Sequence, residues 1–156
     1  MAFAPGRNCQ LGQAAVSGLP SAHVSMLAIH LNTLFVGHFD AGLARQTSPT
    51  QFEVLENSPR FINALVSDGR TLWIGTARGL FASDDGRTIY RPAVRLPSDH
   101  VNGLALGVEG TVWVATSRGI AGLDQSGVRV IDHQSGLPGR IAYAVNVDFL
   151  GNLWVG

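Results

Sequence analysis

Lysine is absent from this chain: all eleven basic residues are arginine, and eleven acidic residues balance them. The resulting formal net charge of zero argues against a dedicated nucleic-acid-binding protein, because such proteins carry a strong basic excess. We therefore expect no nucleic-acid partner. Charged residues make up only 14 % of the chain and hydrophobic residues 46 %. Intrinsic disorder is not expected either, since it goes with few apolar and many charged residues.

Cysteine and long apolar runs are also scarce. Cys9 is the single cysteine of the 156 residues, which excludes an intrachain disulfide and a cysteine-based zinc cluster. No apolar run approaches the roughly 18 residues that cross a bilayer, so we expect no membrane contact by this segment. The first residues lack the basic start and apolar core of a secretory signal peptide.

Glycine, by contrast, is abundant, with 19 residues, and it punctuates an internal repeat. The segment TLWIGTARGLF around Trp73 recurs as TVWVATSRGIA around Trp113 and begins again as NLWVG at Trp154. The segment TLFVGHFDAGLA places Phe35 at the same position. These aromatic residues are 38, 40 and 41 residues apart. A sequence repeat of this length is typical of proteins built from repeated structural units.

A second motif precedes each aromatic segment: LPSAHVSMLAI from Leu19, SPRFINALV from Ser58, LPSDHVNGLAL from Leu96 and LPGRIAYAVNV from Leu137. Together the two motifs divide the chain into phased units. We predict a leading strand of a preceding blade at 1–17, with strand signals near 9–16. Three full units follow at 18–57, 58–95 and 96–136, and an incomplete unit at 137–156.

Each unit carries the signals of four short strands and no amphipathic helical pattern. Runs such as 101–106 and 111–115 combine β-branched and aromatic residues. Tight hairpin turns are predicted at Asp68-Gly69, Glu109-Gly110 and Leu150-Gly151. Fourth strands are expected at 87–91 and 128–133. Four strands every 38 to 41 residues predict an all-β fold, a β-propeller segment of about three and a half four-stranded blades. A β-sandwich is the alternative, but it has no reason to repeat its sequence at blade length.

The combined motif, LP-x-x-x-V followed by a glycine turn, LW-[IV]-G-T and Gly-Leu, resembles the two-component regulator propeller repeat across residues 18–156. Such repeats form sensor domains of bacterial hybrid histidine kinases and related regulators. The resemblance implies a periplasmic or extracellular location in the full-length protein. Three positions depart from the pattern: Phe35 replaces Trp, His38 replaces Thr and Ala115 replaces Gly. Streptogramin lyases carry related blades, so the repeat predicts the fold more narrowly than the function.

The last repeat stops inside its motif, at Gly156. This indicates a segment of a larger ring, and a complete small protein is the alternative. An open arc of blades exposes apolar faces at both ends, and such patches recruit partners. We expect the remaining blades of the propeller, or a second copy of the chain, to cover them.

The aromatic row has two possible roles, ligand stacking or packing between adjacent blades. One aromatic per blade favours packing, since a buried aromatic covers roughly 150–250 Å². We therefore predict structural blade aromatics at Phe35, Trp73, Trp113 and Trp154.

Charge is distributed unevenly within the units. In a propeller, loops entering first strands and loops leaving second strands emerge on one rim. Basic or imidazole side chains gather there, as candidate ligand-binding residues: Arg60, Arg78, Arg118, Arg140, His23, His38 and His100. The opposite rim receives acidic residues: Asp68, Asp84, Asp85, Glu109, Asp124 and Asp148. Arginine suits bidentate recognition of anions, so an anionic small molecule or oligosaccharide is the expected ligand. Bracing of the turns by Arg78 and Arg118 is the alternative.

Other chemistry has little support in the sequence. The five histidines lack the spacing of a metal site, no G-x-S-x-G elbow occurs, and no glycine-rich phosphate loop opens a helix. We predict no catalytic residue, metal or cofactor. The first functional hypothesis is a non-enzymatic ligand-binding sensor propeller of two-component signalling. The alternatives are a protein-interaction scaffold and, with least support, a streptogramin-lyase-like enzyme.

Overall fold

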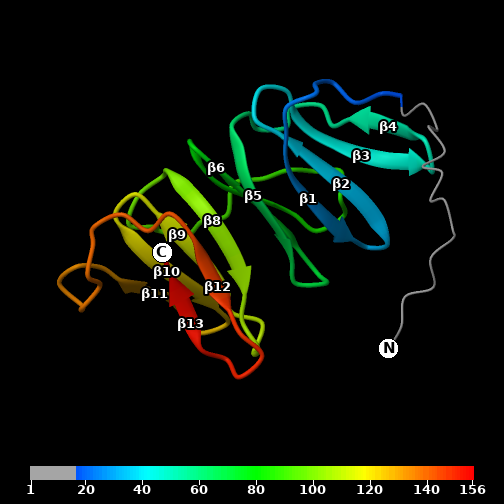
Figure 1. The fold of residues 1–156 in the computed structure, drawn as a ribbon. Coiled ribbons are helices and arrows are strands. Elements are labelled where there is room, and N and C mark those ends of the chain that lie inside the picture. The colour runs from blue at the N-terminus through cyan, green and yellow to red at the C-terminus, as the bar shows by residue number, and fades with distance from the viewer. Residues whose placement is uncertain (1–16) are drawn as a thin grey trace, which may run out of the picture.

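The computed structural model describes residues 17–156, which form thirteen β-strands and no helix. All strand pairs are antiparallel, and they make four consecutive sheets (Figure 1). The first sheet has the order β1-β2-β3-β4 and consists of β1 (Val24–His30), β2 (Thr33–His38), β3 (Gly42–Ser48) and β4 (Gln51–Val54). The leading strand predicted near 9–16 lies outside the described residues.

The other three sheets repeat this meander with different numbers of strands. The second consists of β5 (Ile62–Ser67), β6 (Leu72–Thr76) and β7 (Gly79–Ser83). The third consists of β8 (Val101–Leu106), β9 (Val112–Thr116), β10 (Gly119–Asp124) and β11 (Gly127–Ile131). The fourth pairs β12 (Val145–Val147) with β13 (Leu153–Val155). The all-β prediction and the repeated hairpins are confirmed.

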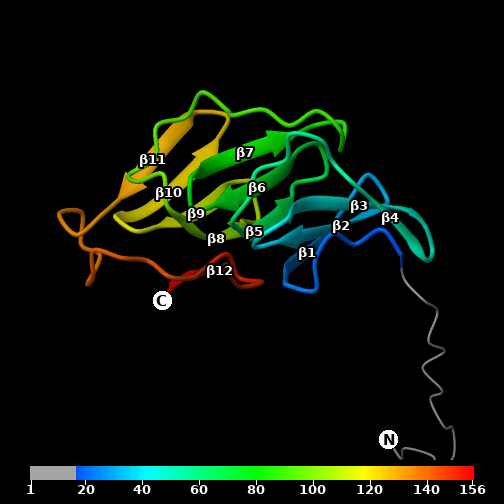
Figure 2. The ribbon, with the colours of Figure 1, turned by 90° about the horizontal axis from the view of Figure 1, so that it is seen from above.

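The sheets stack through their first strands, which contact one another in the series β1, β5, β8, β12. Figure 2 shows the sheets following one another from the β1–β4 sheet to the β8–β11 sheet. Two asparagines at the same position of the repeat join these strands. The Asn63 side chain donates a hydrogen bond to the Val101 carbonyl at 2.8 Å, and Asn102 donates to the Ala142 carbonyl at 2.8 Å.

The core consists of separate apolar clusters, one between each pair of neighbouring sheets. Phe35 and Leu43 pack against Ile62 and Leu65 between the first and second sheets. The second interface contains Leu80, Val101, Val112, Val114, Ala121 and Leu123, and the third contains Ala105, Trp113, Ala115, Ile120, Leu137, Ala142 and Val145. The repeat therefore supplies the same kind of interface three times, which is the packing expected of blades and not of a two-sheet sandwich.

The glycine of the repeat motif allows this close stacking. A Cβ atom on Gly37 would lie 2.8 Å from Ile62 Cγ2, and one on Gly75 would lie 2.6 Å from Val101 Cγ1. Both glycines sit where the first strand of the next sheet crosses the second strand. A side chain at Gly37 or Gly75 would force Ile62 or Val101 of the neighbouring strand to shift.

The fourth strand predicted at 87–91 is wrong. Only Tyr90 pairs with β7, through two 2.9 Å backbone hydrogen bonds with Ala82. Asp85 instead holds a turn, because its Oδ1 accepts hydrogen bonds from the backbone N–H groups of Arg87 and Thr88. Pro92 then follows, and proline has no N–H to continue a ladder. The second sheet consequently keeps three strands.

Candidate functional site

The loops that enter first strands and those that leave second strands lie side by side and form one rim, which we call the basic rim. Equivalent backbone hydrogen bonds tie these loops together in three units. They join Phe39 N to His23 O at 3.2 Å, Ala77 N to Phe61 O at 3.1 Å, and Ser117 N to His100 O at 3.1 Å. The predicted grouping of these loops is thus present in the structure.

Arg78 and Arg118 have the same local setting on this rim. Thr76 Oγ1 accepts a hydrogen bond from the Arg78 N–H at 3.0 Å and donates to the Gly79 carbonyl at 2.8 Å. Thr116 makes the corresponding contacts with Arg118 and Gly119. The buried threonine hydroxyl fixes each turn, and the arginine side chain is left exposed.

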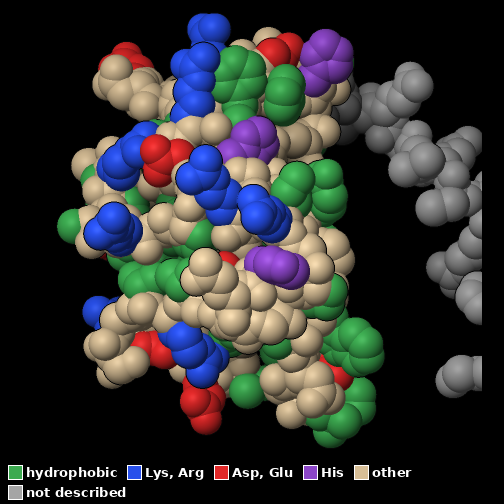
Figure 3. All heavy atoms as spheres, turned by 90° about the vertical axis from the view of Figure 1, so that its left-hand side faces the viewer, with side chains coloured by type: hydrophobic (Ala, Val, Ile, Leu, Met, Phe, Trp, Pro, Cys, Tyr) green, Lys and Arg blue, Asp and Glu red, His purple; other side chains and the backbone are tan. Residues whose placement is uncertain are grey.

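The predicted arginines Arg60, Arg78, Arg118 and Arg140 are all exposed. Within residues 17–156, no carboxylate lies within ion-pairing distance of any of them. Figure 3 shows arginine and histidine side chains spread over this face, with carboxylates mostly toward its edges. Like charges in such proximity raise the local potential and attract anions.

Arg118 and Arg140 come together at a hollow of about 600 Å³. Its lining also includes Ser117, His133 and Gln134, with Asp132 as its acidic member. The Asp132 carboxylate accepts hydrogen bonds from the Ser135 hydroxyl and backbone N–H, and these lower its pKa. The structure therefore brings together two of the four candidate arginines, and it adds His133, which the sequence reasoning did not select.

The three candidate histidines differ. His23 is exposed, and its Nδ1 lies 2.9 Å from Asp40 Oδ2. This contact, with a hydrogen bond from the Ser21 hydroxyl, lowers the pKa of Asp40. His100 is also exposed, and its N–H donates to Ser98 Oγ at 3.1 Å, as His23 N donates to Ser21 Oγ at 3.0 Å. The serine of each LPS motif thus caps the turn that presents the histidine.

His38 was wrongly assigned to the ligand-facing surface, because its side chain is completely buried. Successive side chains of a strand alternate between its faces, and His38, as the last residue of β2, falls on a face of the sheet instead of in the loop. Neither ring nitrogen has a hydrogen-bond partner among the residues that the structure describes. Burial lowers the pKa of His38, opposed by the negative charge of Asp40.

The four repeat aromatics are not equally covered. Phe35 and Trp113 are buried between sheets, and Trp73 is half-buried against the second interface. Trp154 is 63 % exposed, which contradicts its prediction as a packed blade aromatic. It lies on the two-stranded β12–β13 sheet, and no other part of residues 17–156 covers the outer side of that sheet.

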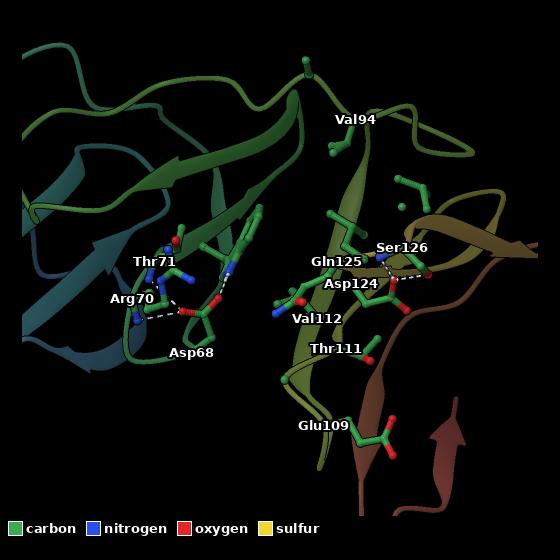
Figure 4. Close-up of a pocket in the computed structure, with 16 residues that line it drawn as sticks. Asp68, Arg70, Thr71, Val94, Glu109, Thr111, Val112, Asp124, Gln125 and Ser126 are labelled. Atoms are coloured by element: carbon green, nitrogen blue, oxygen red, sulfur yellow. Dashed lines mark hydrogen bonds between the residues drawn. The ribbon is translucent and has the colours of Figure 1, made fainter.

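The rim opposite the basic rim carries a larger pocket, which the sequence reasoning missed. Its volume is about 820 Å³, and it lies between the hairpin turns of the second and third sheets. Figure 4 shows Asp68, Arg70 and Thr71 on one side of the pocket and Asp124, Gln125 and Ser126 on the other. The missing fourth strand leaves this space open, and the prolines of segment 84–100 are the sequence signal that could have revealed it.

The acidic residues of this second rim mainly hold turns. Asp68 Oδ1 accepts hydrogen bonds from the backbone N–H groups of Arg70 and Thr71, at 2.9 and 2.7 Å. Asp124 accepts from the Ser126 backbone N–H at 2.7 Å. Asp148 accepts from Asn152 and Trp154 side chains, and these bonds lower its pKa to about 2. The carboxylates are thus largely occupied by their own chain.

In the described part of the chain, no group of three or more His, Cys, Asp or Glu side chains is placed to hold a metal ion. No helix there has the length and apolar character needed to span a membrane.

The comparisons with known proteins identify the fold. No family model matches the chain, and no curated protein matches it. Among solved structures, it is similar to the extracellular domain of a hybrid two-component system from B. thetaiotaomicron. The TM-score is 0.73 at 22 % identity, and the match covers 90 % of this chain and 21 % of that one. The extracellular domain of a one-component system from the same organism has a TM-score of 0.71 at 24 % identity, covering 88 % and 21 %.

Virginiamycin B lyase from Staphylococcus aureus is also similar, with a TM-score of 0.66 at 18 % identity over 88 % of this chain and 50 % of the lyase. The chain spans about a fifth of the length of the two extracellular domains. With identities below 25 %, these likenesses concern the fold alone. The predicted β-propeller architecture is thereby confirmed: the chain consists of consecutive propeller blades.

Proposed function

We propose that this chain is a non-enzymatic ligand-binding module of an extracytoplasmic sensor, and that its basic rim binds an anion. The observation that carries the proposal is the set of exposed rim arginines without a carboxylate partner in the described residues. Two of them, Arg118 and Arg140, share one hollow with His133. The likeness to extracellular domains of signalling systems supports the sensor assignment and the location outside the cytoplasm.

The chemistry of the rim favours binding over catalysis. An arginine presents a planar fork of N–H donors that matches a carboxylate or sulfate, and it stays protonated at every physiological pH. Four such groups on one surface repel one another in the empty protein, and an anion relieves that repulsion. An acidic oligosaccharide has several anionic groups and can therefore contact more than one arginine.

The experiment is a calorimetric titration with polyglucuronate and, as a neutral polymer, dextran. We expect the protein to bind polyglucuronate and not dextran. Affinity should fall as salt is added, because exposed charges are screened over roughly 8 Å at physiological ionic strength. The Arg118→Ala, Arg140→Ala double variant should lose most of the binding.

The matched control is Arg70→Ala with Arg87→Ala, which removes the same charge from the opposite rim and should leave binding unchanged. Equal binding of both polymers, or equal loss in the two double variants, would contradict an anion site on the basic rim.

A lyase-type enzyme is the second candidate, and one contact favours it. His23 and Asp40 form a histidine–carboxylate pair at 2.9 Å on the basic rim, the arrangement that orients a general base. The two side chains are 78 % and 46 % exposed, whereas catalytic groups usually lie in clefts that exclude water. Cleavage of virginiamycin B by the wild type, abolished in His23→Ala, would establish this alternative.

The ends of the blade series offer surfaces for a protein partner. Leu27 and Ile29 of β1 are exposed at one end, and Tyr143 and Trp154 are exposed at the other. Burial of such residues against further blades or a second copy would remove apolar area from water. Light scattering over a concentration series tests this, because a concentration-independent monomer would contradict self-association.

A further inference from the structure

Two phenylalanine rings meet on the basic rim, next to its arginines. Phe39 lies in the β2–β3 loop and Phe61 directly precedes β5, and their ring centroids are 5.4 Å apart with the planes at 74°. Phe39 is 50 % exposed. The pair therefore places a partly exposed apolar surface directly beside the arginines of the basic rim.

The backbone of Phe61 is held in an unfavourable conformation that creates this pair. Its φ is +60°, in the left-handed region that bulky side chains rarely adopt. Two backbone hydrogen bonds enforce it: Phe61 N donates to Phe39 O at 2.7 Å, and Ala77 N donates to Phe61 O at 3.1 Å. Strained residues that the surrounding structure enforces are concentrated at functional sites.

Arg78 completes the cluster. Its guanidinium carbon lies 4.9 Å from the centroid of the Phe61 ring, in cation–π contact. Its backbone is fixed at both ends, since its N–H donates to Thr76 Oγ1 and its carbonyl accepts from Arg91 Nη2 at 2.6 Å. A guanidinium that stacks on a ring keeps its N–H edge free to bind a carboxylate.

We propose that Phe39, Phe61 and Arg78 form a subsite for a ring that bears a carboxylate. The apolar face of the ligand packs on Phe39, and the carboxylate accepts hydrogen bonds from Arg78. The inference deepens the proposed function and rests on it, because it names the chemical unit that the basic rim recognises. A uronic acid and an aromatic acid share this chemistry.

The subsite belongs to one junction between units. At the next junction, between the second and third units, the residues equivalent to Phe39 and Phe61 are Ala77 and His100, which offer no pair of phenylalanine rings. A ligand with several rings would therefore be anchored at the Phe39 end of the rim, and its remaining anionic groups would extend toward Arg118.

The test is a titration of the full chain, followed by NMR, with glucuronate, phenylacetate and acetate. We expect one or both ring acids to bind more tightly than acetate. Arg78→Gln should weaken the binding of these ring acids. Phe39→Ala should lower the affinity for the ring acid roughly tenfold, which corresponds to the loss of about one aromatic stacking contact. Phe149→Ala removes a phenylalanine from the β12–β13 turn, where its side chain is 91 % exposed against 50 % for Phe39, and it should have no effect.

Phe61→Gly gives a second readout, because glycine adopts the left-handed backbone without strain. It keeps the loop and removes the ring, so it should lose binding while remaining folded. Tighter binding of glucuronate identifies the ligand as a sugar acid, and tighter binding of phenylacetate identifies it as an aromatic acid. Ring acids that bind the wild type no better than acetate does, or that bind Phe39→Ala as tightly as the wild type, overturn the subsite. A wild-type protein that does not bind polyglucuronate at all refutes the proposed function itself.

Discussion

The Trp73 indole N–H donates a hydrogen bond to Asp68 Oδ2 at 2.9 Å, across the hairpin that joins β5 to β6. The other oxygen of the same carboxylate holds the turn through the N–H groups of Arg70 and Thr71. Asp148 and Trp154 repeat the relationship at 3.0 Å in the β12–β13 hairpin. A single carboxylate thus closes the turn and orients the aromatic residue of the blade.

Asp68→Ala should destabilise the protein by on the order of 2 kcal/mol, because it leaves three N–H donors without their charged acceptor. Chemical denaturation, monitored by tryptophan fluorescence, measures the loss. Glu109→Ala is the control, since Glu109 occupies the turn of the next unit and makes no side-chain hydrogen bond with a described residue. An equal loss in both variants would show that the carboxylate has no special role.

Trp113→Ala should cost about 3–5 kcal/mol, the usual range for a large aromatic residue in a core. Trp113 is buried between the third and fourth sheets, and the Arg129 guanidinium lies 5.0 Å from its ring. Trp154→Ala should cost about 1 kcal/mol or less, since exposed side chains contribute little. Similar losses of unfolding free energy for the two variants would contradict the observed difference in burial.

Leu31→Asn should stabilise the protein by about 1 kcal/mol, because a left-handed conformation costs a branched side chain roughly that much. Leu31 and Asn32 form the two-residue β1–β2 turn with φ of +47° and +59°. Leu31 is 58 % exposed, so little apolar burial is lost. Leu27→Asn, at a similarly exposed residue within β1, should give no gain in thermal denaturation. A stabilised Leu27→Asn would show that the gain comes from replacing an exposed apolar side chain and not from relief of backbone strain.

His38 should make stability depend on pH between neutral and mildly acidic solution. Burial holds its folded-state pKa below the ordinary value of 6.5, so the unfolded chain takes up a proton more readily than the folded one. Stability is therefore complete above about pH 6.5 and falls as the pH decreases. Denaturation at pH 7 and pH 5 should show this loss in the wild type and a smaller loss in His38→Leu. The exposed control His100→Ala should behave as the wild type, and an unchanged pH dependence in His38→Leu would refute the assignment.

The order of strands and the positions of most turns could be predicted from the sequence. The reason is that the same local pattern occurs in each unit of the repeat, and that hairpin turns depend on residues close together in the sequence. The predicted strand at 101–106 coincides with β8, Val101–Leu106. The fourth strand at 87–91 was mispredicted, because an Asp-Gly turn and the proline after it matter more than β-propensity there.

Local residue patterns were thus sufficient to predict the all-β repeat, the rim on which Arg78 and Arg118 emerge, and the aromatic position of each unit. Which of these side chains are covered depends on how the sheets pack against one another. Phe35 is buried because the second sheet lies against it, whereas Trp154 occupies the same repeat position and remains exposed. Burial of His38 and the pairing of Phe39 with Phe61 likewise depend on contacts between distant segments. Such contacts follow from packing between sheets, and a local pattern of residues does not contain them.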